Sequence, residues 1–306
     1  MDMIRWNRRS VLASIALFSL GAGVGARSAV ARAAAGTRYT MTAFTNSSDS
    51  ELYVYESQDA TNFELLGANA YRPPAGLVRD PSLLRHTDGS YYLTYTTAGD
   101  GHTIGFARST DRINWTHVSD YPVPVPVPKA EAAWAPKWFT HMPGFVGVLV
   151  SISQGHGFTP YLMIATDPAR PIWSPPIPLI GIGPQQPGHL GFIDTTIVAN
   201  DGSYYAFAKN ESTKFIELAV APHPLGPYRF IGLGDWAGWG APREGQCVVA
   251  LPSGGHRIYF DAYTEGKYFY SDSVDGFRTW TAPVELPELS GTVRHFTVLS
   301  EQTIAR

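Results

Sequence analysis

The segments Leu77–Leu84, with the sequence LVRDPSLL, and His86–Tyr95, with the sequence HTDGSYYLTY, together predict a β-hairpin. Asp88-Gly89 is a strong signal for a two-residue turn, and the aromatic and β-branched residues behind it favour a strand. Asp80 therefore lies at the entrance of the first strand, where the proline that follows it is tolerated. The unit thus consists of a carboxylate, an apolar strand, a glycine turn and an aromatic strand.

The same unit recurs twice further along the chain. The segment Gly191–Val198 contains Asp194 and is followed by a glycine turn and an aromatic strand. The segment Arg243–Val249 contains Glu244 and is followed by a second such turn and strand. Three carboxylates at equivalent places in three repeats predict one shared site.

The chain as a whole has the pattern of an all-β protein. Its 24 prolines and 30 glycines divide it into short runs rich in Tyr, Val, Ile, Thr and Phe. Aromatic residues that follow a polar turn recur every 52 to 58 residues, at Phe63, Trp115, Trp173, Tyr228 and Trp280. This period, with about four short strands per unit, predicts a five-bladed β-propeller. Because Tyr39–Phe63 supplies only part of the first blade, we expect residues 292–299 to complete it and to close the ring.

The first 35 residues have the layout of a secretory signal. Arg8-Arg9 precedes an apolar run from residue 11 to about 26, and Ala31-Arg32-Ala33 is a candidate cleavage site. The arginine pair resembles a twin-arginine export signal. The alternative, an uncleaved membrane anchor, is disfavoured because the run is short and rich in Gly and Ala. We therefore expect a periplasmic or extracellular protein whose mature part, residues 36–306, is a single propeller domain without membrane association.

Composition narrows the choice of partners. The net charge is −3 and no basic block occurs, so nucleic acid is not expected as a partner. Cys247 is the single cysteine, which excludes an internal disulfide and suits folding in the reducing cytoplasm before export. We expect its thiol to be buried as a small hydrophobic group.

The three carboxylates suggest acid–base chemistry. In a propeller the innermost strands line a central channel, so Asp80, Asp194 and Glu244 would converge on one cavity. A lone Asp in a turn is usually a solvated cap, but three at matched positions are harder to dismiss. Repulsion and desolvation would raise their pKa values, which can keep one acid protonated while another remains a base. Two such groups across a sugar are the minimal apparatus for glycoside hydrolysis.

These residues carry a resemblance to glycoside hydrolase family 43, which has a five-bladed propeller and an inverting mechanism. The motifs are Arg79-Asp80-Pro81-Ser82, Trp134-Ala135-Pro136, Ile193-Asp194 and Arg243-Glu244-Gly245. The resemblance runs from about Tyr39 to Leu299. More narrowly, four segments are similar to bacterial exo-acting α-1,5-L-arabinofuranosidases: Ala43–Asn46, Ser50–Tyr55, Gly234–Trp239 and Gly291–Phe296.

The resemblance assigns roles residue by residue. It implies that Asp80 is the general base, that Glu244 is the general acid, and that Asp194 tunes and holds the acid. Arg294 would lie beside the sugar, and His295 would lie near the channel axis. In some members this histidine helps to organise water or a calcium ion. No metal-spacing motif here supports calcium independently, so we expect no required cofactor, and a buried, hydrogen-bonded histidine is the simpler interpretation.

Aromatic residues are candidates for sugar contacts. We expect Trp134 and the facing Phe192 to line the sugar site, and Trp236, in a Gly-rich loop with Trp239, to rim the pocket. Packing inside a blade is the competing explanation for any one of them.

Two further features lie close to the expected site. The turn 209–211 either reaches the cavity or is a solvated loop. Lys137 stands where the family often has glutamate, after Trp-Ala-Pro. This departure affects the expected substrate preference more than catalysis, since all three catalytic matches are present.

Together these features predict an inverting exo-α-L-arabinofuranosidase, a monomer that acts on arabinan or on arabinose-containing oligosaccharides. Within enzymes, the alternatives are a xylosidase, an arabinanase or another furanosidase, or a mannoside phosphorylase. A phosphorylase needs a cationic phosphate pocket; no Arg/Lys cluster announces one, although Lys137 and Arg243 keep this alternative open. A non-catalytic sugar-binding propeller is the alternative from another class, and the presence of all three carboxylates argues against it.

Overall fold

The structure is a computed structural model that describes residues 36–124, 131–153, 155 and 157–303. Throughout these ranges the chain forms strands joined by turns and loops, without a helix. It follows that no helix in the described ranges could span a membrane. The export signal predicted for residues 1–35 lies outside the described residues and stays a prediction.

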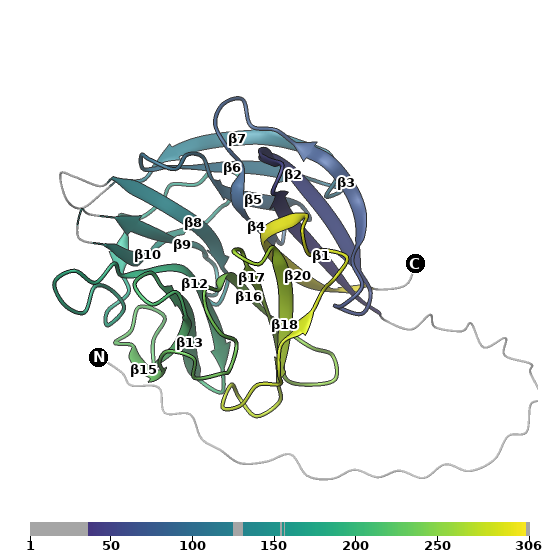
Figure 1. The fold of residues 1–306 in the computed structure, drawn as a ribbon. Coiled ribbons are helices and arrows are strands. Elements are labelled where there is room, and N and C mark those ends of the chain that lie inside the picture. The colour runs from purple at the N-terminus through teal and green to yellow at the C-terminus, as the bar shows by residue number, and fades with distance from the viewer. Residues whose placement is uncertain (1–35, 125–130, 154, 156, 304–306) are drawn as a thin grey trace, which may run out of the picture.

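The described residues form five four-stranded antiparallel sheets, which are arranged as the blades of a propeller (Figure 1). The predicted all-β fold and the number of blades are therefore confirmed. One edge strand of each sheet lies at the centre of the ring. These inner strands are β20 (Val293–Thr303), β4 (Arg79–Arg85), β8 (Ala132–Phe139), β12 (Phe192–Asn200) and β16 (Glu244–Ala250).

The remaining strands follow outward from each inner strand in chain order. The blade of β20 continues with β1 (Gly36–Thr45), β2 (Ser48–Ser57) and β3 (Glu64–Tyr71). The blade of β4 continues with β5 (Tyr91–Thr96), β6 (Thr103–Ser109) and β7 (Trp115–Pro122). The blade of β8 continues with β9 (Val146–Ser153), β10 (Phe158–Ala165) and β11 (Ile177–Pro178). The last two blades add β13 (Ser203–Asn210), β14 (Ile216–Ala221) and β15 (Arg229–Gly232), and β17 (His256–Ala262), β18 (Lys267–Ser273) and β19 (Val284–Glu285).

The hairpin predicted from the first segment is formed by β4 and β5, which pair in antiparallel register. Asp88 fixes its turn with both carboxylate oxygens. Oδ1 accepts a hydrogen bond from the backbone N–H of Ser90 (2.8 Å), and Oδ2 accepts one from the Tyr92 hydroxyl (2.7 Å). A short polar side chain that bonds the backbone two residues ahead is the usual stabiliser of such a turn.

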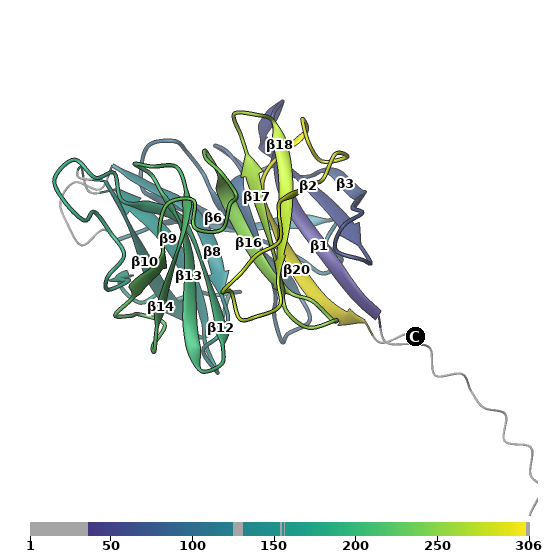
Figure 2. The same ribbon diagram turned by 60° about the horizontal axis from the view of Figure 1, so that its bottom comes forward.

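The ring is closed by strands from the two ends of the sequence. β1 and β20 lie side by side (Figures 1 and 2) and pair from Gly36 with Thr303 to Thr45 with Val293. The expectation that the C-terminal run completes the first blade is confirmed. Because β20 is the inner strand of that blade, the closing strand also faces the channel.

The hydrophobic core is divided into five clusters, each between two neighbouring blades. The periodic aromatics explain why: each packs in or against a different cluster. Phe63, Trp115, Trp173, Tyr228 and Trp280 thus seal the five blade interfaces in turn. The period found in the sequence is therefore the period of blade-to-blade packing.

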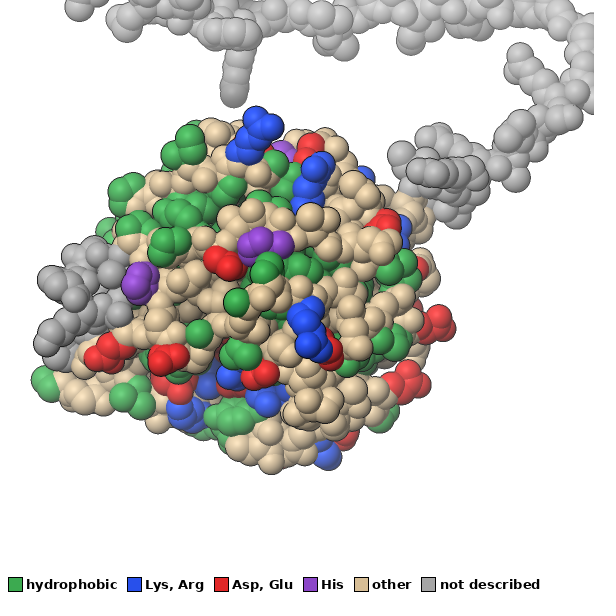
Figure 3. Space-filling view, turned by 90° about the horizontal axis from the view of Figure 1, so that it is seen from above, with side chains coloured by type: hydrophobic (Ala, Val, Ile, Leu, Met, Phe, Trp, Pro, Cys, Tyr) green, Lys and Arg blue, Asp and Glu red, His purple; other side chains and the backbone are tan. Residues whose placement is uncertain are grey.

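Charges of both signs are scattered over the face shown in Figure 3, among apolar and neutral polar atoms. No extended area of one sign is visible on that face. This face therefore offers no area of a single sign that would steer a charged ligand.

Each inner strand contains the same backbone irregularity near its start. The pairing with the next strand shifts there by one residue, so two residues of the inner strand oppose one of its neighbour. One residue of each bulge has a positive φ: Asp80 (53°), Ala135 (49°), Asp194 (58°), Gly245 (64°) and His295 (39°). These residues occupy one structural position repeated in five blades.

This repeat corrects the expected equivalence of the three carboxylates. Asp80 and Asp194 share the left-handed position, but in the last blade that position belongs to Gly245. Glu244 lies one residue earlier, at the position held by Arg294 in the blade of β20. The three acids still face one pocket, but from two different backbone positions.

Gly245 requires its lack of a side chain for two reasons, which gives a test of the bulge. A left-handed φ costs a residue with a Cβ about 1–2 kcal/mol. A Cβ at Gly245 would also lie 2.9 Å from Cγ of His295, whereas at Gly266, with a φ of 63°, nothing lies within 4 Å. We expect Gly245→Ala to lower the free energy of unfolding by about 1–3 kcal/mol more than Gly266→Ala, because the core must also relieve the overlap. Urea unfolding of the two variants measures this difference, and equal losses would contradict the role given to the contact with His295.

Candidate active site

A pocket of about 320 Å³ opens where the starts of the inner strands meet. Asp80, Asp194 and Glu244 all line it, together with Trp134, Arg294 and His295. Arg79, Ile193, Lys209, Glu211 and Tyr263 complete most of the remaining wall. The six residues named first were all predicted to lie at the site, and they come from five different blades.

The bulge explains how so many groups reach one pocket. In a regular strand, neighbouring side chains point to opposite faces. Here consecutive residues of one strand both line the pocket: Arg79 with Asp80, Ile193 with Asp194, and Arg294 with His295.

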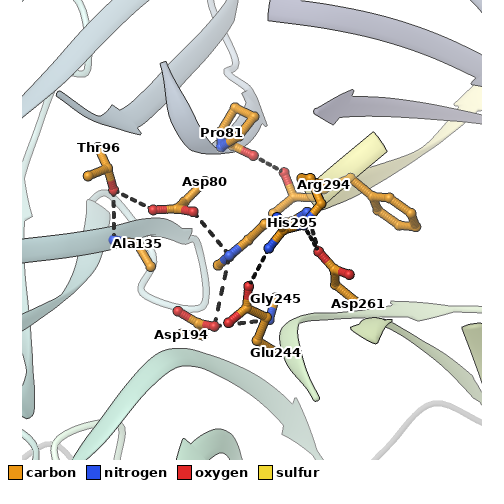
Figure 4. Close-up of polar contacts among 12 residues, drawn as sticks. Asp80, Pro81, Thr96, Ala135, Asp194, Glu244, Gly245, Asp261, Arg294 and His295 are labelled. Carbon is orange, nitrogen blue, oxygen red and sulfur yellow. Dashed lines mark hydrogen bonds and ion pairs between the residues drawn. The ribbon is translucent and has the colours of Figure 1, made fainter. Parts of the chain in front are cut away.

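Asp80 is held at both oxygens (Figure 4). Thr96 Oγ1 donates a hydrogen bond to Oδ2 (2.7 Å) and accepts one from the backbone N–H of Ala135 (2.9 Å). Oδ1 lies 3.1 Å from Nδ1 of His295. Because Thr96 and His295 come from different strands, Asp80 has a fixed orientation toward the pocket.

His295 lies between two carboxylates (Figure 4). Its Nδ1 is 3.1 Å from Asp80 Oδ1 and 3.9 Å from Asp194 Oδ2. Its Nε2 is buried and has no hydrogen-bond partner among the described residues. His295 therefore links the two aspartates near the channel axis, as its position in the predicted site required.

No ligand set for a metal ion is present in the part of the chain that the structure describes. Within it, no group of three or more His, Cys, Asp or Glu side chains is arranged to hold a cation. Asp80 and Asp194, beside His295, already bond to Thr96 and to the backbone of Gly245. These residues do not fit a directly bound calcium ion, and no step of the chemistry below depends on one.

Asp194 is buried and anchored next to the predicted acid. Its Oδ2 accepts a hydrogen bond from the backbone N–H of Gly245 (2.9 Å), the residue that follows Glu244. Burial by itself would raise the pKa of Asp194, but His295, Lys209, Lys137 and the Gly245 N–H lower it below its usual value. The expectation that the clustered acids raise one another's pKa values is therefore wrong for Asp194, because nearby cations outweigh burial.

Glu244 accepts hydrogen bonds from two cations. Lys209 Nζ donates to its Oε2 (2.7 Å), and Arg294 Nη2 donates to its Oε1 (2.9 Å). Arg294 is fixed in turn, since its Nε donates to Oδ2 of buried Asp261 (2.6 Å; Figure 4). Burial raises the pKa of Asp261 to about 6, against the lowering effect of Arg294.

Three residues of the site were missed or left open in the sequence analysis. Asp261, on β17, lies opposite Glu244 in the pairing of β16 with β17. In the sequence, the sign of its role was a single acidic residue within an otherwise aromatic and apolar strand. Lys209 is 3% exposed and Glu211 lines the pocket, so the turn 209–211 reaches the cavity and is not a solvated loop.

Two predicted sugar contacts lie elsewhere. Phe192 is buried in a blade interface, stacked on Phe230 with ring centroids 5.0 Å apart. Trp236 packs edge-on against Trp239, and its Nε1 donates to the carbonyl of Ile216 (3.0 Å). Neither residue lines the pocket, so these two placements are corrected: both aromatics seal blades. The aromatic ring that packs against Trp134 is that of Phe158, with the two ring centroids 4.6 Å apart.

Lys137 lies below the pocket in the central channel. It is 4% exposed, and its Nζ donates to the carbonyl of Gln246 and to Oγ1 of Thr196 (3.2 Å). Burial lowers its pKa, although Asp194 and Asp80 oppose this effect. The residue that departs from the family motif therefore ties three inner strands together and adds positive charge beneath the acids.

Several solved structures resemble this fold. An endo-1,4-beta-xylanase from Bacteroides thetaiotaomicron has a TM-score of 0.62 at 13% identity, covering 81% of this chain and 91% of that one. Zg3597, a family 117 glycoside hydrolase of Zobellia galactanivorans, has a TM-score of 0.55 at 17% identity, covering 68% and 69%. An endo-arabinase from Bacteroides thetaiotaomicron has a TM-score of 0.51 at 16% identity, covering 68% and 81%. At these identities the likeness concerns the fold alone.

No curated protein has a significant sequence match to this chain. The sequence model of the glycosyl hydrolases of family 43, however, matches residues 71–224, about half of the chain. The matched segment contains Asp80 and Asp194, which share the left-handed position of their inner strands. This propeller, with its pocket of paired carboxylates, belongs to glycosyl hydrolase family 43.

Proposed function

We propose that the protein is an inverting exo-α-L-arabinofuranosidase that releases arabinose from the ends of arabinan or arabino-oligosaccharides. The observation that carries this proposal is the convergence of Asp80 and Glu244, from different blades, on one pocket that Asp194 also lines. The family gives glycoside hydrolysis, and the similarity of the segments around Phe44, Tyr53, Trp236 and Arg294 to arabinofuranosidases supports the choice of sugar.

In the proposed reaction, Asp80 removes a proton from water as the water attacks the anomeric carbon. Thr96 and His295 orient Asp80, which lines the pocket. Glu244 gives a proton to the leaving oxygen, and the bond from that oxygen to the anomeric carbon breaks. An inverting enzyme needs roughly 6.5–9.5 Å between base and acid to admit the water. The positions of these two acids on separate blades support such a gap.

The size of the pocket supports attack at chain ends. About 320 Å³ lies at the lower end of the range for ligand pockets, and suits a single sugar ring with its leaving group. Trp134, held by a hydrogen bond from Nε1 to the carbonyl of Gly99 (2.9 Å), gives a rigid aromatic wall for that ring.

The charges of the pocket favour hydrolysis over phosphorolysis. Lys209 and Arg294 are already engaged by carboxylates, and among the lining residues that the structure describes, Arg79 is the one arginine or lysine without an acidic partner. A phosphate dianion needs several free donors, whereas water needs none. A xylosidase or an arabinanase on the same propeller remains the second candidate, which the products distinguish.

The products of linear arabinan test the mode of attack. We expect free arabinose to be the main early product by chromatography, while the viscosity of the solution falls slowly. A rapid fall in viscosity with little free arabinose would contradict exo action. Turnover of 4-nitrophenyl xyloside in place of the arabinofuranoside would instead identify a xylosidase.

The two acids are distinguished by their dependence on the leaving group. Asp80→Asn should abolish turnover of every substrate, because no leaving group replaces the base. Glu244→Gln should slow arabinan by about 10²–10⁴-fold but a 4-nitrophenyl arabinofuranoside far less, since a phenol departs without a proton. Glu265→Gln, at an exposed carboxylate that pairs with Arg243, is the control and should retain activity on both substrates. Equal losses on both substrates for Glu244→Gln would show that Glu244 is not the proton donor.

The contribution of the ionised Asp194 carboxylate to the free energy of unfolding should depend on pH. Its folded-state pKa is below its unfolded value, so the ionised carboxylate stabilises the fold above about pH 4, and this contribution is lost as the pH falls through the lower folded value. We expect the difference in unfolding free energy between the wild type and Asp194→Asn to be constant from pH 5 to 7 and to shrink below pH 4. Urea unfolding at several pH values measures it, and a difference that is flat down to pH 3 would refute this origin.

A further inference from the structure

Both oxygens of Glu244 face a cation in the arrangement described above, which favours the charged carboxylate over the protonated acid. Lys209 Nζ donates to its Oε2 and Arg294 Nη2 donates to its Oε1. An ammonium and a guanidinium have donors but no acceptor. Each cation occupies one lone pair of Glu244 and favours its charged form, so withdrawal of one cation makes it easier for Glu244 to carry a proton.

Arg294 is the less mobile of the two cations. Its Nε donates to Asp261 Oδ2 at 2.6 Å, and Asp261 is 1% exposed. Moving the guanidinium away would leave a buried carboxylate without its partner, which is strongly unfavourable.

Lys209 has a second acceptor within reach. Its Nζ lies 3.1 Å from Oε2 of Glu211, an oxygen that accepts no hydrogen bond among the described residues. Glu211 itself is fixed, because its backbone N–H donates to the carbonyl of Gly191 (2.9 Å) and its Oε1 bonds Lys214. A lysine has rotatable donors on a flexible stem, so a small rotation transfers its hydrogen bond from one glutamate to the other.

We propose that Glu211 is a positioning residue that draws Lys209 away from Glu244 when substrate fills the pocket, and thereby lets Glu244 carry the proton for the leaving group. This inference rests on the proposed role of Glu244 as general acid. The proton that Glu244 donates is replaced from solvent after each turnover, and Asp80 returns the proton it took from water to solvent. No oxidant, metal or further reactant is needed.

Other charged groups also surround Glu244 and stay in place in this scheme. Burial by itself would lower the pKa of Lys209, but Glu244, Asp194 and Glu211 raise it above its usual value, so the ammonium keeps its charge on either glutamate. The remaining groups that face Glu244 or its partners come from five strands and two turns: Asp80, Asp194, Asp261, Tyr263, Arg294, His295, Lys137 and Lys214.

The leading test is Glu211→Gln, assayed on arabinobiose and on 4-nitrophenyl arabinofuranoside. Without the second carboxylate, Lys209 stays on Glu244. We expect kcat on arabinobiose to fall at least about tenfold and kcat on the aryl substrate to fall less than about threefold, because only the sugar leaving group needs the proton. The basic limb of the kcat profile on arabinobiose should move to lower pH. Glu265→Gln is again the matched control and should change neither rate.

A double-mutant cycle tests whether Glu211 acts through Lys209. With Lys209→Met, Glu244 loses a cation and the basic limb should move to higher pH. Glu211→Gln should then have no additional effect on the ratio of the two rates, since there is no lysine left to draw away. Equal losses on both substrates for Glu211→Gln, or a full loss that persists in the Lys209→Met background, would overturn the proposal.

A readout without substrate separates this inference from the proposed function. Isotope-edited infrared spectra of the carboxyl groups follow protonation of Glu244, identified by its absence in Glu244→Gln. The pH at which this band appears should be higher in Lys209→Met than in wild type, and an unchanged pH would overturn the inference. If Glu244→Gln slows both substrates equally, the general-acid role fails instead. If Glu244→Gln is selective but Glu211→Gln is not, only the role of Glu211 fails.

Discussion

A regular strand presents only every second side chain to the channel, and the left-handed bulge at the start of each inner strand removes that limit. The bulge lets Asp80 and Arg79, or His295 and Arg294, reach the same pocket from adjacent positions. The cost of a positive φ at a residue with a side chain is of the order of 1–2 kcal/mol. Four of the five bulges have a residue with a side chain at this position, and only Gly245 avoids the cost. Backbone strain of this kind is typical of functional sites.

The pocket then has to accommodate several charges close together. Its acids are not left to repel one another: Asp194 is balanced by His295, Lys209 and Lys137, and Glu244 by Lys209 and Arg294. A buried carboxylate without such partners would be strongly destabilising. The lysine that departs from the family motif at residue 137 contributes to this balance from below.

Much of this could be read from the sequence, for identifiable reasons. The blade number followed from the spacing of Phe63, Trp115, Trp173, Tyr228 and Trp280, because the same contact is needed at every blade interface. The site residues Asp80, Asp194, Glu244, Arg294 and His295 were found because they start apolar strands or match a family motif.

What was missed depends on side-chain direction and on pairing between distant strands. Phe192 precedes the bulge and faces the blade, while Ile193 and Asp194 face the pocket, and strand alternation alone does not locate the extra residue. Asp261 becomes important only through Arg294, 33 residues further along the chain. Lys209 is buried because it pairs with Glu244 on another blade, a contact that its neighbours in the sequence do not reveal.

The pairing of β1 with β20 also has a consequence for the timing of synthesis. Arg294 and His295 lie on β20, the strand that closes the ring. A ribosome-bound chain therefore lacks these two pocket-lining residues until β20 has emerged. Contacts between such distant segments form late, because the entropy cost of closing a long loop comes before the stabilising contacts are made. A chain without β20 would expose the edge of β1 and an incomplete pocket, so we expect activity only once β20 has paired with β1.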